Sequence, residues 1–317
     1  MTATSFGRTL QASTRVFRPS SWTLSQRENV TGWIFLTPWL LGLIIFTAGP
    51  LLASLALSFT KWNSLGTAPT WNGLWNYRHI FTKDPDFYPS LQVTFKFALM
   101  TLPARLVLSM ALALLLNMKI RGIDYYRTLL YLPAVLPAVA VVMLWLWIFQ
   151  PDFGLINYML SLVGIQGPTW FSDPKWALPA LAIMSFWDIG GGAIIYLAGL
   201  QNIPPHLYEA AEVDGAGRWQ RFWRITLPLM TPTIFFNLVM GLIGIMQTFT
   251  TAFVATGGGP QKATLFYMLV VYSNAFQSFF MGYASALAWI LAMIILLLTL
   301  LVFKSSSLWV FYESEVK

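Results

Sequence analysis

Six long apolar runs constrain the fold of this chain more than any other feature of its sequence. An α-helix needs about 20 predominantly apolar residues to cross the hydrocarbon core of a bilayer. Runs of this length occupy approximately residues 32–59, 92–116, 128–149, 176–200, 229–254 and 283–303. The chain is 57% hydrophobic and only 10% charged, whereas soluble domains contain roughly 25% charged residues. The sequence therefore predicts an all-α integral membrane protein with six transmembrane helices.

Several spans contain residues that disturb a regular helix. Pro38 and Pro50 are expected to kink the first span. The third span contains two more prolines, and the fourth is interrupted by Asp188 and the glycine triplet 190–192. Neighbouring helices satisfy backbone groups freed at such points, so these residues are compatible with a membrane position. Residues 262–281 are only moderately apolar and are expected to form an interfacial or half-buried helix, with a re-entrant segment as the alternative.

The distribution of Lys and Arg indicates which side of the membrane the loops occupy. Six spans place both termini on one side, together with twelve of the 19 basic residues: Arg8, Arg15, Arg18, Arg27, Lys119, Arg121, Arg127, Arg218, Arg221, Arg224, Lys304 and Lys317. The opposite side has Lys61, Arg78, Lys83, Lys175 and Lys262, and the spans themselves contain Lys96 and Arg105. Cytoplasmic loops are enriched in Lys and Arg, which predicts an N-in/C-in topology.

This topology divides the chain into three parts. Residues 1–30 are predicted to be a cytoplasmic tail, because they are polar and basic and lack the apolar core of a signal peptide. Residues 31–304 form the transmembrane domain, which includes a cytoplasmic loop at 201–228. Residues 305–317 are predicted to be a second cytoplasmic tail.

The loop from Glu209 to Pro228 is the longest polar interruption in the second half of the chain. Its sequence predicts a short helix, a glycine turn and a second helix that runs into the next span. Pro205 suits a first helical turn, where its missing N–H is not needed. Gly215 suits the left-handed conformation that ends many helices. The three arginines of the second helix, three residues apart, are expected to lie along one side of it.

One pattern in this loop resembles a known family. It reads E-A-A, three residues, G, nine residues, I-x-L-P, and is met by Glu209, Ala210, Ala211, Gly215, Ile225, Leu227 and Pro228. It resembles the cytoplasmic loop of the permease subunits of bacterial ABC importers that depend on a binding protein. The flanking sequence is similar to the maltose-type sugar importers, and the amino-terminal pattern to their first permease. In that family the loop is the coupling helix that docks on the ATPase subunit, so Glu209 and Asp214 offer charges for partner contacts.

The resemblance implies the type I importer fold and a set of partners. These are a second permease in a heterodimer, two ATPase subunits, an extracytoplasmic solute-binding protein and a sugar or oligosaccharide substrate. ATP and Mg²⁺ are expected on the partner ATPase, with no cofactor in this chain, no catalytic residue and no nucleic-acid partner. The expected location is the bacterial cytoplasmic (inner) membrane, and the expected mechanism is alternating access.

Two charges lie near the middle of predicted spans. A buried charge at this depth is costly and usually faces a cavity or a partner, so Arg105 and Asp188 are expected to approach one another. Such a contact is either a structural pair or the edge of a translocation path. Trp187, Asn237 and Gln247 are also predicted for a sugar path, because a sugar site needs aromatic faces and amide or hydroxyl groups at membrane depth. They are chosen from a wider set of candidates: Trp145, Trp147, Trp187, Tyr196, Asn237, Gln247 and Phe249.

The alternatives are a related permease for a non-sugar solute, an ion-coupled secondary transporter and an integral-membrane enzyme. Intramembrane acids are sparse and no internal repeat is evident, which disfavours the secondary transporter. No cluster of His, Asp or Glu supports an enzyme. The chain has no cysteine, and the pair His206 and Glu209 provides too few ligands for a zinc site, so no metal site is expected.

Overall fold

A computed structural model describes residues 23–66, 68–118 and 120–311 of the chain. The chain divides into two compact units, residues 1–54 and 55–317, which are described separately. Most of the predicted amino-terminal tail lies outside the described residues. Residues 312–317 of the predicted carboxy-terminal tail also lie outside them.

The first unit contains α1 (Leu24–Leu43), the π-helical turn η1 (Ile44–Ala48) and the start of α2 (Gly49–Ser58). The three form one helical run of 35 residues. Thr23 and Gln26 form a capping box at its start, which explains why the helix begins before residue 31. The π-helical turn lies just before Pro50, whose ring removes one backbone donor from the helix.

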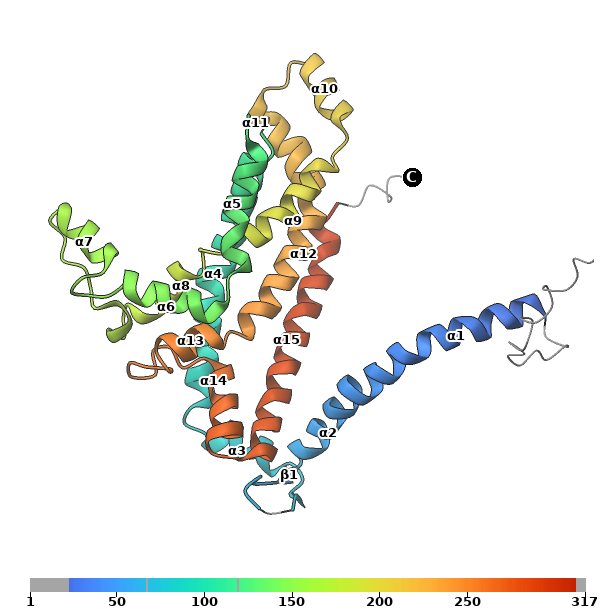
Figure 1. The fold of residues 1–317 in the computed structure, drawn as a ribbon, viewed down its shortest axis with the longest axis vertical. Coiled ribbons are helices and arrows are strands. Elements are labelled where there is room, and N and C mark those ends of the chain that lie inside the picture. The colour runs from blue at the N-terminus through green and yellow to red at the C-terminus, as the bar shows by residue number, and fades with distance from the viewer. Residues whose placement is uncertain (1–22, 67, 119, 312–317) are drawn as a thin grey trace, which may run out of the picture. The chain divides into compact units, whose positions relative to one another are not determined.

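In the second unit a small hairpin connection follows α2. Strand β1 (Thr60–Lys61) pairs antiparallel with β2 (Thr70–Trp71), in the register Thr60 to Trp71 and Lys61 to Thr70. Helix α3 (Trp75–Lys83) follows. The buried side chain of Asn76 donates hydrogen bonds to the carbonyls of Ser58 (2.8 Å) and Thr60 (2.9 Å), and so fixes α3 to the hairpin. This region lies at the opposite end of the unit from α10 (Figure 1).

Helix α4 (Phe87–Leu116) is a single unbroken span, as predicted. The predicted third span is not a single unbroken helix, because α5 (Ile123–Val135) and α6 (Ala138–Ile148) meet at an angle of 95°. The break falls at Leu136, which is extended (φ −69°, ψ 143°). Pro137 explains it, because its ring removes a donor and disfavours a helical conformation in the preceding residue. The span predicted over 128–149 is therefore a sharply bent pair of helices.

After the short helices α7 (Leu155–Leu162) and η2 (Trp170–Ser172), the predicted fourth span consists of α8 (Ala177–Met184) and α9 (Ile189–Gln201). These helices are bent by 44°. The break spans residues 185–188, so the predicted interruption at Asp188 is confirmed. Asp188 occupies the position that precedes the first turn of α9.

The protruding loop contains α10 (Pro205–Val213). Helix α11 (Arg218–Arg221), the π-helical turn η3 (Phe222–Thr226) and α12 (Leu227–Met246) then form one span of 29 residues. The predicted fifth span extended to residue 254, but the helix ends at Met246 and α13 (Thr250–Ala255) is separate. The hydroxyl of Thr248 donates to the carbonyl of Ile245 (2.7 Å), a local bond that competes with continuation of the helix.

The last elements are α14 (Tyr267–Tyr272), the π-helical turn η4 (Ser273–Gln277) and α15 (Met281–Trp309). Tyr267, Leu269 and Val270 are buried, so the half-buried helix expected within 262–281 is present. Tyr267 donates to the carbonyl of Leu287 in α15 (2.9 Å). Helix α15 continues beyond residue 304, where the transmembrane domain was predicted to end.

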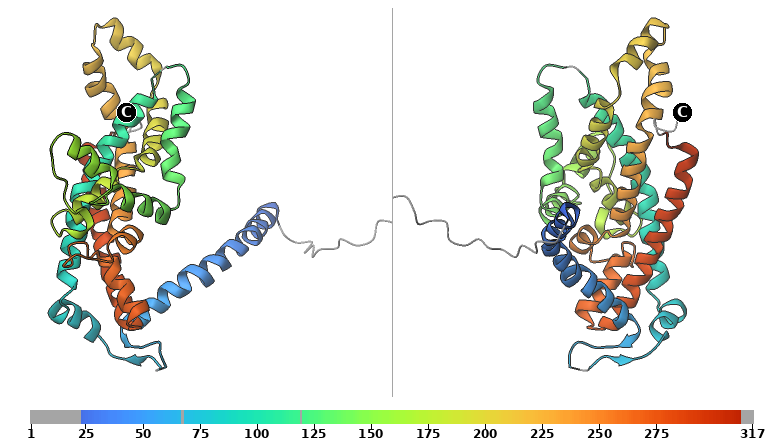
Figure 2. Two further views of the ribbon diagram at one scale, coloured as in Figure 1. Left: turned by 60° about the vertical axis from the view of Figure 1, so that its left-hand side comes forward. Right: turned by 90° about the vertical axis from the view of Figure 1, so that its right-hand side faces the viewer.

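The predicted all-α class is confirmed. Within the described residues, four helical runs are long and apolar enough to cross a membrane, and the count rises to six if each bent pair is one span. In the second unit α4 packs against α9 and α12, while α14 and α15 pack together (Figure 2). One apolar cluster surrounds Phe97, Leu181 and Phe266, and another surrounds Ala113, Tyr196 and Met230.

Candidate functional site

A cavity of about 560 Å³ lies within the second unit, among α4, α9 and α12 and the two helix breaks. Its lining combines apolar side chains with a small number of polar groups. The polar and glycine residues that line it are Arg105, Ser109, Ser185, Asp188, Gly192, Tyr196, Asn237, Gly241, Gly244, Thr248 and Thr251. Such a mixture is typical of a small-molecule site, where a few polar groups fix the orientation of a ligand.

Arg105 and Asp188 form an ion pair at the wall of this cavity. The Nη2 atom of Arg105 lies 2.9 Å from the Oδ1 atom of Asp188, and the two side chains are 31% and 48% exposed. The predicted approach of these two intramembrane charges is therefore confirmed. Asp188 also precedes the first turn of α9, where the partial positive charge of the helix favours an anion.

A second side chain of α4 contacts the start of α9, just after the break between α8 and α9. The hydroxyl of Ser109 donates to the carbonyl of Ile189 at 3.0 Å. Ser109 lies one helical turn after Arg105, so both side chains project from one face of α4. Helix α4 thus binds the start of α9 through a guanidinium and a hydroxyl.

The glycine triplet of α9 allows three neighbouring helices to approach closely. A Cβ atom at Gly190 would overlap the carbonyl oxygen of Leu130 in α5. At Gly192 it would lie 3.0 Å from Oγ of Ser109 and 3.5 Å from Oδ1 of Asn237. At Gly191 it would meet only the Cβ of Ala134 at an ordinary 3.5 Å. Gly190 is therefore required for the close approach of α5, and Gly192 for that of Ser109 on α4.

Four of the five residues predicted for a sugar path line the cavity: Arg105, Trp187, Asp188 and Asn237. Gln247 does not line it; this residue is exposed just after the end of α12. The register that carries Asn237, Gly241 and Gly244 to the cavity continues to Thr248 instead. A continuous helix turns by about 100° per residue, which would also place Thr248 on the face of Asn237 and Gln247 away from it.

Sequence reasoning missed Ser109 in the lining, whereas Tyr196, one of the wider set of sugar-path candidates, does line the cavity. A usable signal for Ser109 was present in the spacing, because this residue follows Arg105 by four positions on α4. Residues four apart share one helix face. A search for polar residues at this spacing within the apolar runs would have identified Ser109.

The turn that ends α10 has the geometry expected from Gly215. Gly215 has φ +78°, a left-handed conformation that glycine adopts without steric penalty. The N–H of Gly215 donates to the carbonyl of Glu212 (3.1 Å), and the N–H of Ala216 donates to that of Ala211 (2.8 Å). These two bonds form a Schellman motif, which satisfies the last carbonyls of the helix.

Side chains hold α10 against the following helix. Arg221 pairs with Glu212 across the turn at 3.0 Å. The hydroxyls of Tyr208 and Thr226 lie 2.9 Å apart. The three arginines are not equivalent: Arg221 is half-buried and paired, whereas Arg218 and Arg224 are exposed.

The eight residues predicted to couple the chain to an ATPase fall into two groups. On α10 and its turn, the exposed residues are Glu209, Ala210, Asp214 and Gly215, with Ala211 half-buried. Ile225, Leu227 and Pro228 are half-buried at the start of the following span, and Ile225 packs against the apolar cluster around Met230. The first group can contact a partner, and the second supports the loop from within the protein.

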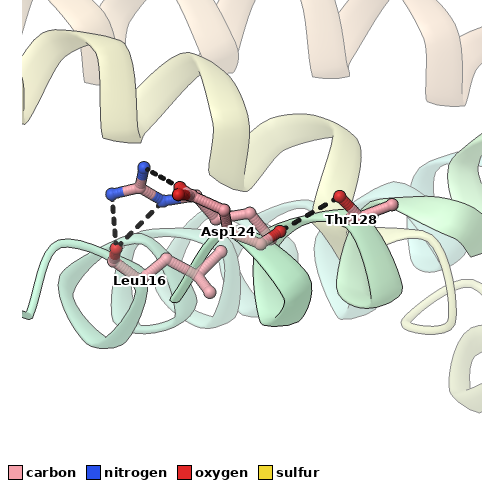
Figure 3. Close-up of polar contacts among 4 residues, drawn as sticks. Leu116, Asp124 and Thr128 are labelled. Carbon is pink, nitrogen blue, oxygen red and sulfur yellow. Dashed lines mark hydrogen bonds and ion pairs between the residues drawn. The ribbon is translucent and has the colours of Figure 1, made fainter. Parts of the chain in front are cut away.

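A neighbouring turn, between α4 and α5, is also fixed by a basic side chain. Arg127 donates from Nε and Nη2 to the carbonyl of Leu116 (3.4 and 3.1 Å) and from Nη1 to Oδ1 of Asp124 (3.0 Å). Figure 3 shows these contacts together with the bond from Thr128 to the carbonyl of Asp124. The guanidinium thereby satisfies a terminal carbonyl of α4, a favourable use of a cation at a helix end.

Within the described residues, no group of three or more His, Asp or Glu side chains is arranged to hold a metal ion. His206 and Glu209, both on α10, are exposed and therefore lie on a surface that is available to a partner.

Comparisons with known proteins show what this chain resembles. Residues 105–306 match the family described as binding-protein-dependent transport system inner membrane component. The probable ABC transporter permease protein YesP of Bacillus subtilis (strain 168) is 47% identical over 92% of this chain and 94% of that protein. The lactose transport system permease protein LacF of Rhizobium radiobacter is 33% identical over 90% of this chain and 96% of that protein.

Solved structures are similar over nearly the whole chain. One is a bacterial ABC transporter involved in the import of the acidic polysaccharide alginate, with a TM-score of 0.77 and 25% identity over 89% of this chain and 96% of the matched chain. A second is the bacterial alginate ABC transporter in complex with an alginate pentasaccharide-bound periplasmic protein, also with a TM-score of 0.77 and 25% identity, over 88% of this chain and 95% of the matched chain.

Proposed function

Because this chain belongs to the family of binding-protein-dependent transport system inner membrane components, we propose that it is a transmembrane subunit of an ATP-driven ABC importer. Its substrate is a sugar or oligosaccharide that an extracytoplasmic solute-binding protein delivers. The observation that carries this proposal is the combination of a polar cavity among the membrane helices with an exposed helix, α10, at one end of the same unit (Figure 1).

Helix α10 is the contact with the ATPase. Its exposed residues include Glu209 and Ala210, and the exposed Asp214 follows at its end. These residues offer two charges beside a small side chain that lets a helix approach a groove closely. The turn at Gly215 and the pair Glu212–Arg221 hold this helix in a defined position on the span that begins at Arg218. A movement of the ATPase is therefore transmitted to α12, which lines the cavity.

The cavity is part of the translocation path. It is lined by side chains from both sides of the α8–α9 break and from the α5–α6 break. Breaks of this kind are tolerated at membrane depth where the backbone lines a cavity. Alternating access requires two discrete arrangements of such elements, and the short helices around the cavity are suited to rearrange between them.

The relatives support the proposed substrate class and partners. The names of relatives include permeases for lactose, for sulfoquinovosyl glycerol and for sn-glycerol 3-phosphate, and the structural neighbour imports a polysaccharide. A heterodimer with a second permease, two ATPase subunits that bind ATP and Mg²⁺, and a binding protein complete the importer. The chain itself hydrolyses no ATP, and its place is a bacterial inner membrane with both termini in the cytoplasm.

Uptake of labelled sugar into proteoliposomes tests this proposal. The vesicles contain this chain with its partner permease and ATPase, and the binding protein is added on the side from which the sugar is supplied. Uptake is expected to require ATP and the binding protein and to be unaffected by ionophores that collapse cation gradients. Uptake that persists without ATP and stops with the ionophores would establish the secondary transporter instead. ATP-dependent uptake of a non-sugar solute, without uptake of any sugar, would establish that the chain is a related permease for a non-sugar solute.

A further inference from the structure

Helix α3 has one buried and one exposed face. Ile80 is fully buried in the apolar cluster that includes Leu287 of α15, and Asn76 is bonded to the hairpin. The residues of the exposed face recur at the three- and four-residue spacing of one side of a helix: Leu74, Trp75, Arg78, Phe81 and Thr82. Leu74, Trp75 and Phe81 are 68%, 50% and 47% exposed. A contiguous exposed apolar patch marks a contact with another protein or with a membrane.

The buried face fixes the level of α3 along the membrane spans. Helix α3 packs against α15, and Leu287 of the shared cluster belongs to the apolar run of that span. Leu287 lies six residues, or about 9 Å of helix axis, after Met281, the first residue of α15. Residues 84–86 alone join α3 to α4. Helix α3 therefore stays beside the ends of two spans, at the depth where a bilayer meets water (Figure 1).

Aromatic contacts hold the exposed side chains of α3 to these spans. The ring of Trp75 stacks on His79 with centroids 4.7 Å apart, and His79 meets the ring of Tyr283 in α15 edge-on at 5.8 Å. The hydroxyl of Tyr88 in α4 donates to the carbonyl of Phe81 (3.1 Å). Trp and Tyr are enriched where a membrane meets water, because their rings combine apolar and polar surface. The patch is therefore a fixed aromatic surface of the kind found at that depth.

The charge within the patch is positive. Arg78 lies on the exposed face of α3, and no carboxylate among the described residues pairs with it. The two acidic residues that follow α3 are engaged elsewhere: Asp84 accepts a hydrogen bond from Tyr283, and Asp86 pairs with Lys262. An unpaired guanidinium matches the geometry of a phosphate group. The patch therefore complements the headgroups of anionic phospholipids.

We propose that α3 is an interfacial helix whose exposed face binds anionic phospholipid at the outer surface of the membrane. Trp75 and Phe81 enter the boundary between headgroups and acyl chains, and Arg78 binds a headgroup phosphate. A partner that arrives from the water would have to displace lipid at this depth, so the membrane itself is the occupant that fits. The inference goes beyond the proposed function and rests on it only for the side of the membrane on which α3 lies.

The first arm of the test measures what covers the exposed face. The whole complex is placed in lipid nanodiscs, in which both membrane faces meet the solution, with a bimane label on Phe81→Cys. Quenching by lipids that carry a nitroxide at the headgroup is compared with quenching by iodide in the water. Leu65→Cys is the matched control, because Leu65 is 71% exposed and lies in the connection between β1 and β2. The ratio of lipid to iodide quenching is expected to be several-fold higher at Phe81→Cys.

Three outcomes of this arm would overturn the proposal. Equal ratios at the two positions would show that the exposed face of α3 lies in water. Absence of quenching by either agent at Phe81→Cys would show that a protein surface covers it. Protection from iodide that appears only when the binding protein is added would identify that protein as the occupant. None of these readouts needs transport, so failure of the proposed function would appear separately in the uptake assay.

The second arm tests the role of Arg78 in the labelled Phe81→Cys protein. Nitroxide-labelled phosphatidylglycerol is expected to quench the label more strongly than nitroxide-labelled phosphatidylcholine at equal content, by roughly two- to fivefold, the enrichment that one basic residue causes at a membrane surface. Arg78→Gln is expected to abolish this difference. Lys175→Gln, which removes an exposed cation just before α8, is expected to keep it. Equal quenching by the two lipids with Arg78 present, or a difference that survives Arg78→Gln, would overturn the assignment.

Discussion

Single residues of α4 determine how the broken helix α8–α9 meets the cavity. Arg105 binds Asp188 and Ser109 binds the carbonyl of Ile189, so the first turn of α9 is held from one side by two polar contacts. The glycines of the same turn allow backbone and side chains of α5 and α12 to approach from the other sides. Substitutions of the charged residues therefore test the ion pair, and substitutions of the glycines test the close packing of the helices.

Reversal of the ion pair tests the contact directly. Arg105→Ala and Asp188→Ala are each expected to lower the free energy of unfolding by about 1–2 kcal/mol, between the values for exposed and for fully buried pairs. Sugar uptake is expected to fall in both. The double variant Arg105→Asp with Asp188→Arg is expected to recover most of the lost stability and uptake. A double variant as impaired as the single ones would show that the contact does not matter.

The glycine triplet offers a matched pair of substitutions. Gly190→Ala places a methyl group on the carbonyl of Leu130 and is expected to lower the stability of the protein by about 1–3 kcal/mol, as overpacking does. Gly191→Ala meets only an ordinary contact and is expected to leave stability unchanged or slightly raised. Thermal unfolding of the two purified variants measures the difference. Equal melting temperatures would contradict the close packing of α5 on α9.

At the scale of elements, the loop between α9 and α12 combines an exposed helix with a rigid turn. The Schellman bonds at Gly215 and the contact of Arg221 with Glu212 leave α10 few alternative positions. A helix that transmits a movement to α12 must not swing freely, and these contacts provide the necessary stiffness.

Two glycines of this loop differ in backbone conformation and test that stiffness. Gly215 has φ +78°, whereas Gly217 is extended with φ −66°, and a Cβ atom there would meet only Oε1 of Gln220 at 4.0 Å. Gly215→Ala is expected to destabilise the turn by about 1–2 kcal/mol, the penalty of a left-handed residue with a side chain. Gly217→Ala is expected to have little effect. Limited proteolysis should therefore cleave the loop faster in Gly215→Ala alone, and equal cleavage would contradict the account.

At the scale of the whole molecule, the two ends of the second unit are expected to face opposite sides of the membrane. The chain has no cysteine, so a single introduced cysteine is the only thiol in the chain that a maleimide can label. Leu65 in the hairpin connection is 71% exposed and Val213 at the end of α10 is 88% exposed. In intact spheroplasts an impermeant maleimide is expected to label Leu65→Cys, and to label Val213→Cys only after permeabilisation. The reverse pattern would place both termini outside.

Some of this architecture was accessible from the sequence and some was not. The lengths of the apolar runs, the turn at Gly215 and the pairing of Arg105 with Asp188 follow from local chemistry or from the high cost of a lone buried charge. The 95° angle between α5 and α6 does not follow from the sequence, because Pro137 predicts a break in the helix but not the direction of the bend. The lining of the cavity depends on helix register, and Gln247, which was selected by residue type alone, lies off the face that carries Asn237 and Gly241.

Copurification from solubilised membranes tests the central claim, that α10 couples this chain to an ATPase. Wild-type protein is expected to retain a second permease and an ATPase. Glu209→Lys on α10 is expected to release the ATPase and keep the permease. Asp152→Lys, a charge reversal at an exposed site in the loop between α6 and α7, is the matched control and is expected to retain both. Absence of any ATPase from the wild-type preparation, or its equal retention by Glu209→Lys, would contradict the account.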